Sequence, residues 1–134
     1  MITSKVTYSG ELRTKAIHIR SSQEIITDAP IDNQGKGEAF SPTDIVCSAL
    51  CSCMMTIMGQ VAQRENIPME GVTAEVTKLM SAAPRKISEI IMKFDMSKLN
   101  ILDKQRKMLE NAARTCPVAL SLSDDVIQTI SFDY

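Results

Sequence analysis

A long apolar segment that begins at Ser41 constrains the fold of this chain more than any other feature. Ser41 is a typical helix N-cap, Pro42 suits the first helical position, and Asp44 brings a carboxylate to the unpaired amides of the first turn. Asn66 and Pro68 mark the end of the segment. The apolar residues between these signals recur at helical spacing and include Ile45, Val46, Ala49, Leu50, Cys53, Ile57 and Val61. The sequence therefore predicts one long helix.

This helix is predicted to be apolar around nearly its whole circumference in its first turns, so we expect it at the centre of the fold. Its most apolar window, Ile45 to Gly59, is interrupted by Ser and Thr and bounded by Asp44. The window falls short of the roughly 20 residues that a bilayer crossing needs. We therefore expect a buried core helix and no association with a membrane.

The segments around the helix are predicted to be mainly strands. Residues 2–27 alternate apolar and polar side chains between turn-like stretches, which is typical of a three-stranded meander. The Gly- and Pro-rich stretch 28–39 is predicted to be a loop, long enough to indicate a functional or interface role. The remaining predicted elements are strands near 72–77 and 89–96, a helix at 103–115, a short helical turn after Pro117, and a strand at 126–132. This order indicates an α+β fold rather than a regular βαβ alternation.

The length and charge of the chain limit the classes of function. A chain of 134 residues can form one domain, residues 1–134, with its own core. A formal net charge of -1, with acidic and basic residues interspersed, argues against nucleic-acid binding. The N-terminus lacks the apolar stretch of a secretory signal, so we expect a cytoplasmic protein with reduced thiols. Its four cysteines are then more typical of metal-binding or catalytic groups than of structural disulfides.

Three of the cysteines lie within the predicted long helix. Cys47 and Cys51 share one helix face, whereas Cys53 points about 120° away from Cys47. The three sulfurs therefore cannot converge on one tetrahedral metal ion, and we expect neither a metal nor a cofactor. Because Cys47 and Cys51 align with Met54 and Met58, we expect them to pack in the core as small apolar side chains.

Cys53 and Cys116 are the candidate reactive thiols. Cys116 precedes Pro117, which can open a helical turn whose unpaired amides would favour a thiolate. Cys53 lies mid-helix in apolar surroundings that would raise its pKa, so a nearby cation is needed to ionise it. The single histidine, His18, has no second histidine or carboxylate cluster beside it in the sequence, and we expect it on a strand surface.

The stretch "FSPTDIVCSALCSCMMTIMG", followed much later by "CPVALSL", resembles the OsmC/Ohr family of thiol-dependent peroxidases. In the family pattern a peroxidatic cysteine follows the proline of the helix start by eleven residues, and a second cysteine, often in Cys-Pro-Val, lies on a later helix. Pro42 and Cys53 keep that spacing here, and Cys116 begins the second motif. The order of elements agrees along essentially the whole chain.

The resemblance implies an intertwined homodimer in which β-sheets wrap around central long helices. It also implies that Cys53 attacks a hydroperoxide and becomes a sulfenic acid, that Cys116 condenses with it to a disulfide, and that an external thiol or dithiol reduces the disulfide. Organic hydroperoxides are the expected substrates, because Met54, Ile57 and Met58 are expected to line the pocket.

The resemblance also points to the groups around the reactive sulfur. Arg13, in the first turn, matches the position of the arginine that stabilises the thiolate; Arg20 is a second candidate, and a solvated hairpin arginine is the alternative. Where the family has a catalytic glutamate this chain has Thr43, with Asp44 one position later, either as a substitute or only as a helix cap. The alternative function is therefore a non-catalytic protein of the same fold that binds a small apolar ligand or senses oxidation.

The length of the helix predicts a packed neighbour independently of the family. Ten residues of helix span about 15 Å, so neither Thr43 nor Asp44 can touch Cys53 of its own helix. They could reach such a cysteine only from an antiparallel neighbouring helix. We therefore expect that neighbour to be a second copy of this chain.

Overall fold

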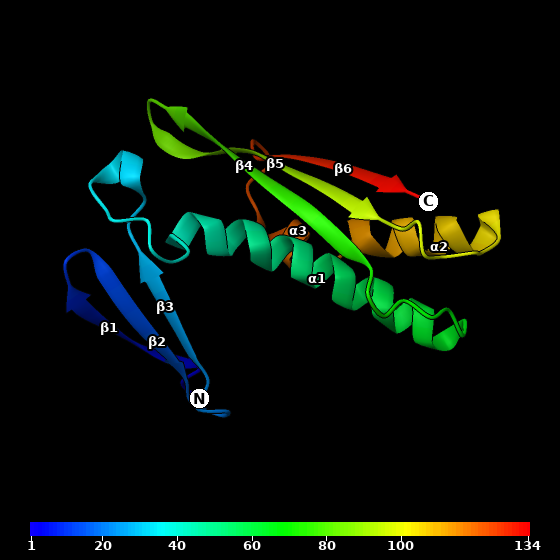
Figure 1. Cartoon of the computed structure of the whole chain (residues 1–134), viewed down its shortest axis with the longest axis horizontal. Coiled ribbons are helices and arrows are strands. Elements are labelled where there is room, and N and C mark those ends of the chain that lie inside the picture. Colours follow the sequence, from blue (N-terminus) through cyan, green and yellow to red (C-terminus); the bar gives the residue numbers. More distant parts are fainter. The chain divides into compact units, whose positions relative to one another are not determined.

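The computed structural model describes all 134 residues, which form two compact units, Met1–Val46 and Cys47–Tyr134 (Figure 1). Helix α1, Pro42–Arg64, begins in the first unit and continues through the second. The prediction of an α+β fold is confirmed by the two three-stranded sheets, with one long helix between them in sequence and two shorter helices between the last two strands.

The N-terminal unit is an antiparallel meander of β1, Ser4–Gly10, β2, Arg13–His18, and β3, Glu24–Asp28. The β1–β2 turn contains Glu11 and Leu12 in the left-handed region, with φ of 55° and 61°. Two such residues in succession fit the twist of a tight hairpin. The following loop, predicted to lack regular structure, contains a short 3-10 helix, Ile31–Asn33.

The N-terminal unit has no apolar core. Its only buried residues are Asp28 and Ser41. Cross-strand register places Val6, Ala16 and Ile25 in one row on the same sheet face, and Val6 and Ile25 are 61% and 52% exposed. The unit therefore leaves an uncharged, apolar sheet face uncovered within its own residues.

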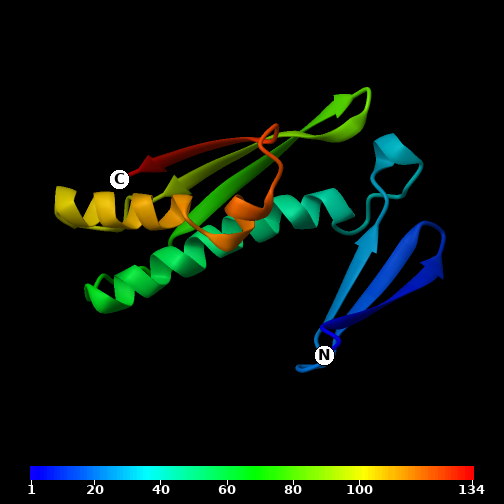
Figure 2. The ribbon, with the colours of Figure 1, turned by 180° about the vertical axis from the view of Figure 1, so that it is seen from behind.

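The C-terminal unit contains a mixed sheet with strand order β4-β5-β6. Strand β4, Thr73–Ala82, pairs antiparallel with β5, Arg85–Asp95, whereas β6, Ile127–Asp133, joins β5 in parallel. The crossover that a parallel pair requires is supplied by α2, Asp103–Arg114, and α3, Pro117–Ser121. The helices cover one face of this sheet in both views of the ribbon (Figures 1 and 2).

The core of the C-terminal unit forms between α1, α2 and the inner face of β5. Alternate residues of β5 point inward, and Ile90, Met92 and Phe94 are completely buried. Phe94 stacks on Phe132 of β6 with ring centroids 5.2 Å apart. Leu109 of α2 is also completely buried in this cluster. Full burial of such side chains stabilises a fold by roughly 1.5–3 kcal/mol each.

Helix α1 buries one face rather than its whole circumference. Its buried residues are Cys47, Leu50, Cys51, Met54, Met58, Val61 and Ala62. On the opposite side Ala49, Ser52 and Thr56 are exposed, so the helix is central to the core, as expected, on one face only. The helix continues to Arg64 and has 23 residues. By length and composition it could cross a membrane, whereas its shorter apolar window predicted a segment too short to do so. Core helices of soluble proteins have the same properties.

Candidate functional site

Cys53 and Cys116 lie together in the C-terminal unit. Cys53 is half-buried in the middle of α1, and Cys116 is fully buried at the N-cap of α3. The two thiols are within hydrogen-bonding reach of each other, and all four cysteines are free thiols. The structure therefore brings together the two candidate reactive sulfurs. Cys53 is partly accessible and Cys116 is enclosed.

The local sequence fixes the position of the Cys116 sulfur. Pro117 is the first helical residue of α3, and the amide of Ala119 donates a hydrogen bond of 3.3 Å to Cys116 Sγ. The carbonyl oxygen of Ala119 accepts a hydrogen bond of 3.1 Å from Gln128 Nε2, which ties α3 to β6. The predicted helical turn after Cys116 and the predicted contact of its sulfur with backbone amides are both confirmed.

The ionisation of Cys116 differs from the expectation. Burial raises the pKa of its thiol above the ordinary value, and the neighbouring thiol of Cys53 raises it further. The amides of Ala119 and Val118 act in the opposite direction, but they do not outweigh the burial. Cys116 is therefore a neutral thiol at neutral pH rather than the thiolate that its position before Pro117 suggested.

Cys47 and Cys51 are core residues, as predicted. They are 1% and 6% exposed, and burial raises the pKa of the Cys51 thiol. Nowhere in the structure do three or more His, Cys, Asp or Glu side chains gather closely enough to bind a metal ion. His18 is exposed at the end of β2, as predicted, where its Nδ1 lies 2.6 Å from the hydroxyl of Ser21.

Arg13 lies in the N-terminal unit between two carboxylates. It stands directly opposite Asp28 in the β2–β3 register, and its Nη2 lies 3.4 Å from Asp28 Oδ2 and 2.8 Å from Glu38 Oε2. Hydrogen bonds to Glu38 and then to Asp28 raise the pKa of Arg13. The pKa of Asp28 is lowered, above all by the backbone amide of Glu38, which donates to Asp28 Oδ2 at 2.9 Å. Arg13 and Asp28 therefore both stay charged at neutral pH.

Asp28 and Glu38 were not predicted as site residues; both belong to the stretch 28–39, which was predicted only to be a loop. A signal for Asp28 was available, because it directly follows the predicted meander of residues 2–27, and extending the last strand by one residue places it opposite Arg13. No comparable signal marks Glu38, since its position depends on how the loop closes. Arg20, the second candidate for the cation, is exposed.

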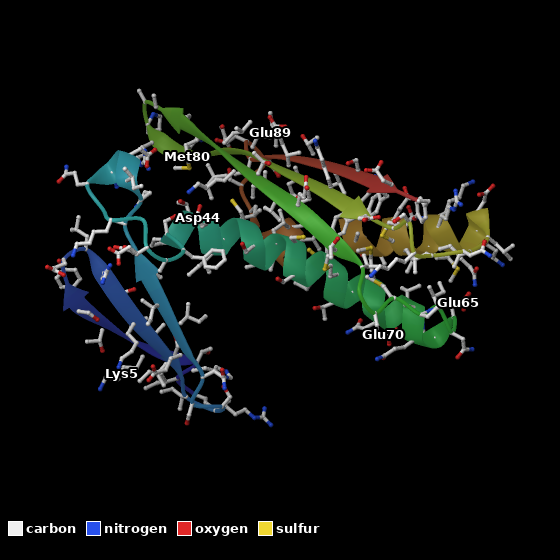
Figure 3. The ribbon with its side chains drawn as sticks, viewed as in Figure 1. Lys5, Asp44, Glu65, Glu70, Met80 and Glu89 are labelled. Atoms are coloured by element: carbon white, nitrogen blue, oxygen red, sulfur yellow. The ribbon has the colours of Figure 1, made fainter.

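Thr43 and Asp44 occupy the first turn of α1, where Figure 3 labels Asp44. Asp44 Oδ2 accepts a 3.0 Å hydrogen bond from the amide of Ser41, and the amide of Asp44 donates one of 3.1 Å to Ser41 Oγ. The Thr43 hydroxyl lies 3.2 Å from the Ser41 hydroxyl. These reciprocal bonds form a capping box, so the role of Asp44 as a helix cap is confirmed.

The expected apolar substrate pocket is not built as predicted. Met54 and Met58 are completely buried in the core cluster, so within this chain they do not line a cavity open to substrate. Ile57 remains half-buried. The physical reason is the one-sided burial of α1, which turns both methionines inward.

Comparisons with known proteins agree with this geometry. A model of the OsmC-like protein family matches residues 35–131. No curated protein matches the chain at a significant level. Among solved structures, a candidate osmotic stress induced and detoxification response protein of Psychrobacter arcticus 273-4 is 53% identical, covers 98% of this chain and 96% of its own, and superposes with a TM-score of 0.93.

Two more distant structures share the fold. The organic hydroperoxide resistance protein OsmC of Legionella pneumophila is 16% identical, with a TM-score of 0.72 over 100% of this chain and 98% of its own. The organic hydroperoxide resistance protein OhrB of Bacillus subtilis is 18% identical, with a TM-score of 0.65 over 98% of both chains. From the family match, which spans most of the sequence, and from the shared architecture, we conclude that the chain belongs to the OsmC-like protein family.

Proposed function

We propose that this protein is a thiol-dependent peroxidase that reduces organic hydroperoxides through Cys53 and Cys116. The observation that carries the proposal is the direct approach of the two thiols, one half-buried and one fully buried. An accessible sulfur can meet a peroxide, and an enclosed neighbour can then close a disulfide without a large movement. Membership of the OsmC-like family supports the same chemistry.

The proposed reaction has three steps. The Cys53 thiolate attacks the outer peroxide oxygen, the O–O bond breaks, and the alkoxide leaves and takes a proton to become an alcohol. The Cys116 sulfur, having lost its proton, attacks the resulting sulfenic acid, forms a disulfide with Cys53 and releases water. An external thiol or dithiol supplies the two electrons that restore both thiols.

We assign the ionisation of Cys53 to Arg13. A guanidinium is always charged at physiological pH, and an adjacent cation lowers the pKa of a thiol. Thr43, at the position of the family's glutamate, can form hydrogen bonds but brings no charge. Asp44 is not assigned a catalytic role, because its carboxylate caps α1.

The proposed substrate class is supported by the names of the structural neighbours. Two of them are called organic hydroperoxide resistance proteins, and a third is linked to osmotic stress and detoxification. We propose a role for this chain in defence against peroxides on that basis.

We also propose that the protein acts as a homodimer. The N-terminal unit buries no apolar residue and leaves Val6, Tyr8 and Ile25 largely exposed. A second copy of the chain would remove this apolar surface from water.

The test is stopped-flow consumption of cumene hydroperoxide by the reduced protein. Wild type should react rapidly, and Cys53→Ser should lose the reaction. Cys116→Ser should complete one turnover and accumulate a sulfenic acid that dimedone traps. Cys51→Ser, two residues from Cys53 but in the core, is the matched control and should react as wild type does. Equal, slow consumption by wild type and Cys53→Ser would refute the proposal.

One observation favours a second function. Thr43 stands where the family has a catalytic glutamate, and its hydroxyl lies beside that of Ser41. Loss of this charge fits a protein of the same fold that senses oxidation or binds a small apolar ligand. Slow, stoichiometric formation of the disulfide, with no turnover when reductant is supplied, would favour this second function.

A further inference from the structure

Gln128 is a polar residue on the inner, otherwise apolar row of β6. Burial alternates along this strand, and Gln128, Ile130 and Phe132 share its half-buried face. The parallel register places Gln128 beside Ile90 of β5, which is completely buried. A side-chain amide in such a position is costly unless it forms a hydrogen bond.

The hydrogen-bond partner of Gln128 is a backbone carbonyl of α3. Gln128 Nε2 donates a hydrogen bond of 3.1 Å to the carbonyl oxygen of Ala119. Because α3 ends at Ser121, no residue of the helix lies four positions beyond Ala119 to donate to that carbonyl. Gln128 therefore supplies a donor that so short a helix cannot supply to itself.

Helix α3 cannot be held in place by its own residues. It has five residues and none of them is buried, and a helix of this length is unstable in isolation. The hydrogen bonds from the Leu120 amide to the Cys116 carbonyl and from the Ser121 hydroxyl to the Pro117 carbonyl both lie within the turn. Contacts with the rest of the C-terminal unit therefore decide whether the turn stays formed, and the bond from Gln128 is one of these contacts.

The residue that Gln128 binds also contacts the sulfur of Cys116. The amide of Ala119 donates a hydrogen bond of 3.3 Å to Cys116 Sγ, so Ala119 is fixed through both its amide and its carbonyl. The thiol of Cys53 lies within hydrogen-bonding reach of that sulfur. A reacting group that is held within reach of its partner reacts with a high effective concentration. Gln128 thus connects the sheet, through Ala119, to the direction in which the Cys116 sulfur points.

We propose that Gln128 is a positioning residue for closure of the disulfide: its bond to the Ala119 carbonyl keeps α3 formed and the Cys116 sulfur beside Cys53. This rests on the proposed function, in which Cys116 closes a disulfide with Cys53. Because Gln128 acts through Ala119, it affects how fast and how completely the disulfide closes. It does not affect the attack of Cys53 on the hydroperoxide.

The first test uses no peroxide. The whole reduced chain is equilibrated with glutathione buffers at pH 7, and the Cys53–Cys116 disulfide is quantified by peptide mass after alkylation of the free thiols. The Cys53 thiolate attacks oxidised glutathione and releases one reduced glutathione, and the Cys116 thiolate then displaces the second. Gln128→Met keeps the length of the side chain but removes the donor. We expect the equilibrium constant for closure to fall about tenfold, which raises the reduction potential by about 30 mV.

The second test separates the two steps of the proposed reaction. With one equivalent of cumene hydroperoxide, Gln128→Met should form the sulfenic acid at the wild-type rate. It should then close the disulfide about tenfold more slowly, because the effective concentration of Cys116 is lower. Dimedone should therefore trap more of the variant than of wild type. A general loss of structure would not be confined to the second step.

Thr129→Val is the matched control. Thr129 follows Gln128 on β6 but is exposed on the opposite face, where its hydroxyl donates a hydrogen bond of 2.6 Å to Glu89 Oε2. The substitution removes a side-chain hydrogen bond of the same strand that does not involve α3, so the equilibrium and both rates should stay unchanged. Should Gln128→Met fail to fold by circular dichroism, Gln128→Glu carries the test with the same losses expected, since it keeps the length and replaces the donor with an acceptor.

The outcomes separate this inference from the proposed function. An unchanged equilibrium constant and closing rate in a folded Gln128 variant overturns the inference and leaves the peroxidase proposal intact. An equal loss in Thr129→Val also overturns the inference, because any weakening of β6 would then suffice. The expected shift in glutathione buffers, with no reaction of wild type with hydroperoxide, supports the positioning role and refutes the peroxidase proposal. Failure of wild type to form the disulfide overturns both.

Discussion

The thiol of Cys53 on α1 lies within hydrogen-bonding reach of the thiol of Cys116, which stands at the start of α3. The contact depends on Pro117, which opens the turn, and on the Ala119 amide, which binds the Cys116 sulfur. Burial nevertheless raises the pKa of Cys116, so this thiol is protonated at neutral pH. The two sulfurs thus differ in both accessibility and environment.

The raised pKa of Cys116 makes stability dependent on pH at the alkaline end. A thiol whose pKa is higher in the folded state contributes stability that is fully present below its unfolded value, about 8.5. That contribution is lost as the pH rises through the folded value. We expect the free energy of unfolding of the reduced protein, measured in urea from pH 7 to pH 10, to fall above about pH 8.5.

The control for this pH dependence is Cys116→Ala, which removes the titrating group. Its curve should be flatter than that of wild type above the same pH, although the variant is less stable overall. Parallel curves for the two proteins would show that Cys116 is not the group responsible.

Substitutions at two neighbouring residues of β3 can test whether a second chain covers the N-terminal sheet. Ile25 and Ile26 are 52% and 56% exposed but face opposite sides, because successive strand residues alternate. Ile25 shares its face with Val6 and Ala16, whereas Ile26 lies opposite Lys15. We expect Ile25→Glu to disrupt the dimer and Ile26→Glu to leave it intact.

Light scattering at micromolar concentration provides the measurement for these two variants. Wild type and Ile26→Glu should have twice the 14.8 kDa mass of one chain, and Ile25→Glu should not. A single-chain mass for wild type would contradict the proposed dimer.

Closure of the loop before α1 depends on Gly35. A Cβ at this position would lie 1.7 Å from the carbonyl oxygen of Ala29, so the backbone would have to move. We expect Gly35→Ala to lower the free energy of unfolding by about 1–3 kcal/mol, as overpacking does. Urea denaturation measures the change.

Gly59 is the matched control because it lies within α1, and a Cβ there would meet nothing within 4 Å in the single chain. Gly59→Ala should raise stability by about 0.5–1 kcal/mol through helix propensity. An equally stable Gly35→Ala would contradict the tight loop, and a destabilised Gly59→Ala would indicate that another molecule packs on this face.

The capping box at the start of α1 predicts a structural role for Asp44. Asp44→Ala removes the acceptor for the Ser41 amide, and we expect a loss of about 0.5–2 kcal/mol of stability. The alkylation rate of Cys53 at pH 7.5 should stay within about twofold of wild type, well under the tenfold of one pKa unit. The control Asp124→Ala removes an exposed carboxylate and should change neither quantity. A large fall in Cys53 reactivity with unchanged stability would instead make Asp44 part of the reactive site.

The features predicted correctly from the sequence are those that depend on residues close together in the chain. Ser41, Pro42 and Asp44 marked the start of α1 because N-capping depends on adjacent residues. Helical spacing correctly assigned Cys47 and Cys51 to the core. The pairing of Cys53 with Cys116 came from the family resemblance, since sequence separation contains no information on distance.

Features that depend on distant residues were not predictable in the same way. Parallel pairing of β6 with β5 is set by the crossover through α2 and α3, which no local pattern encodes. The environment of Arg13 depends on sheet register and on the closure of the loop that brings Glu38 back to Asp28. The pKa of Cys116 could not be inferred because it balances burial against two amides.

The parallel docking of β6 has a consequence for biosynthesis. Cys116 belongs to the crossover that leads to β6, and Gln128 of that strand ties α3 in place. The partner of Cys53 is thus secured only when the last strand of the sheet has docked. Until that strand docks, a chain still being synthesised holds no Cys116 thiol in place beside Cys53.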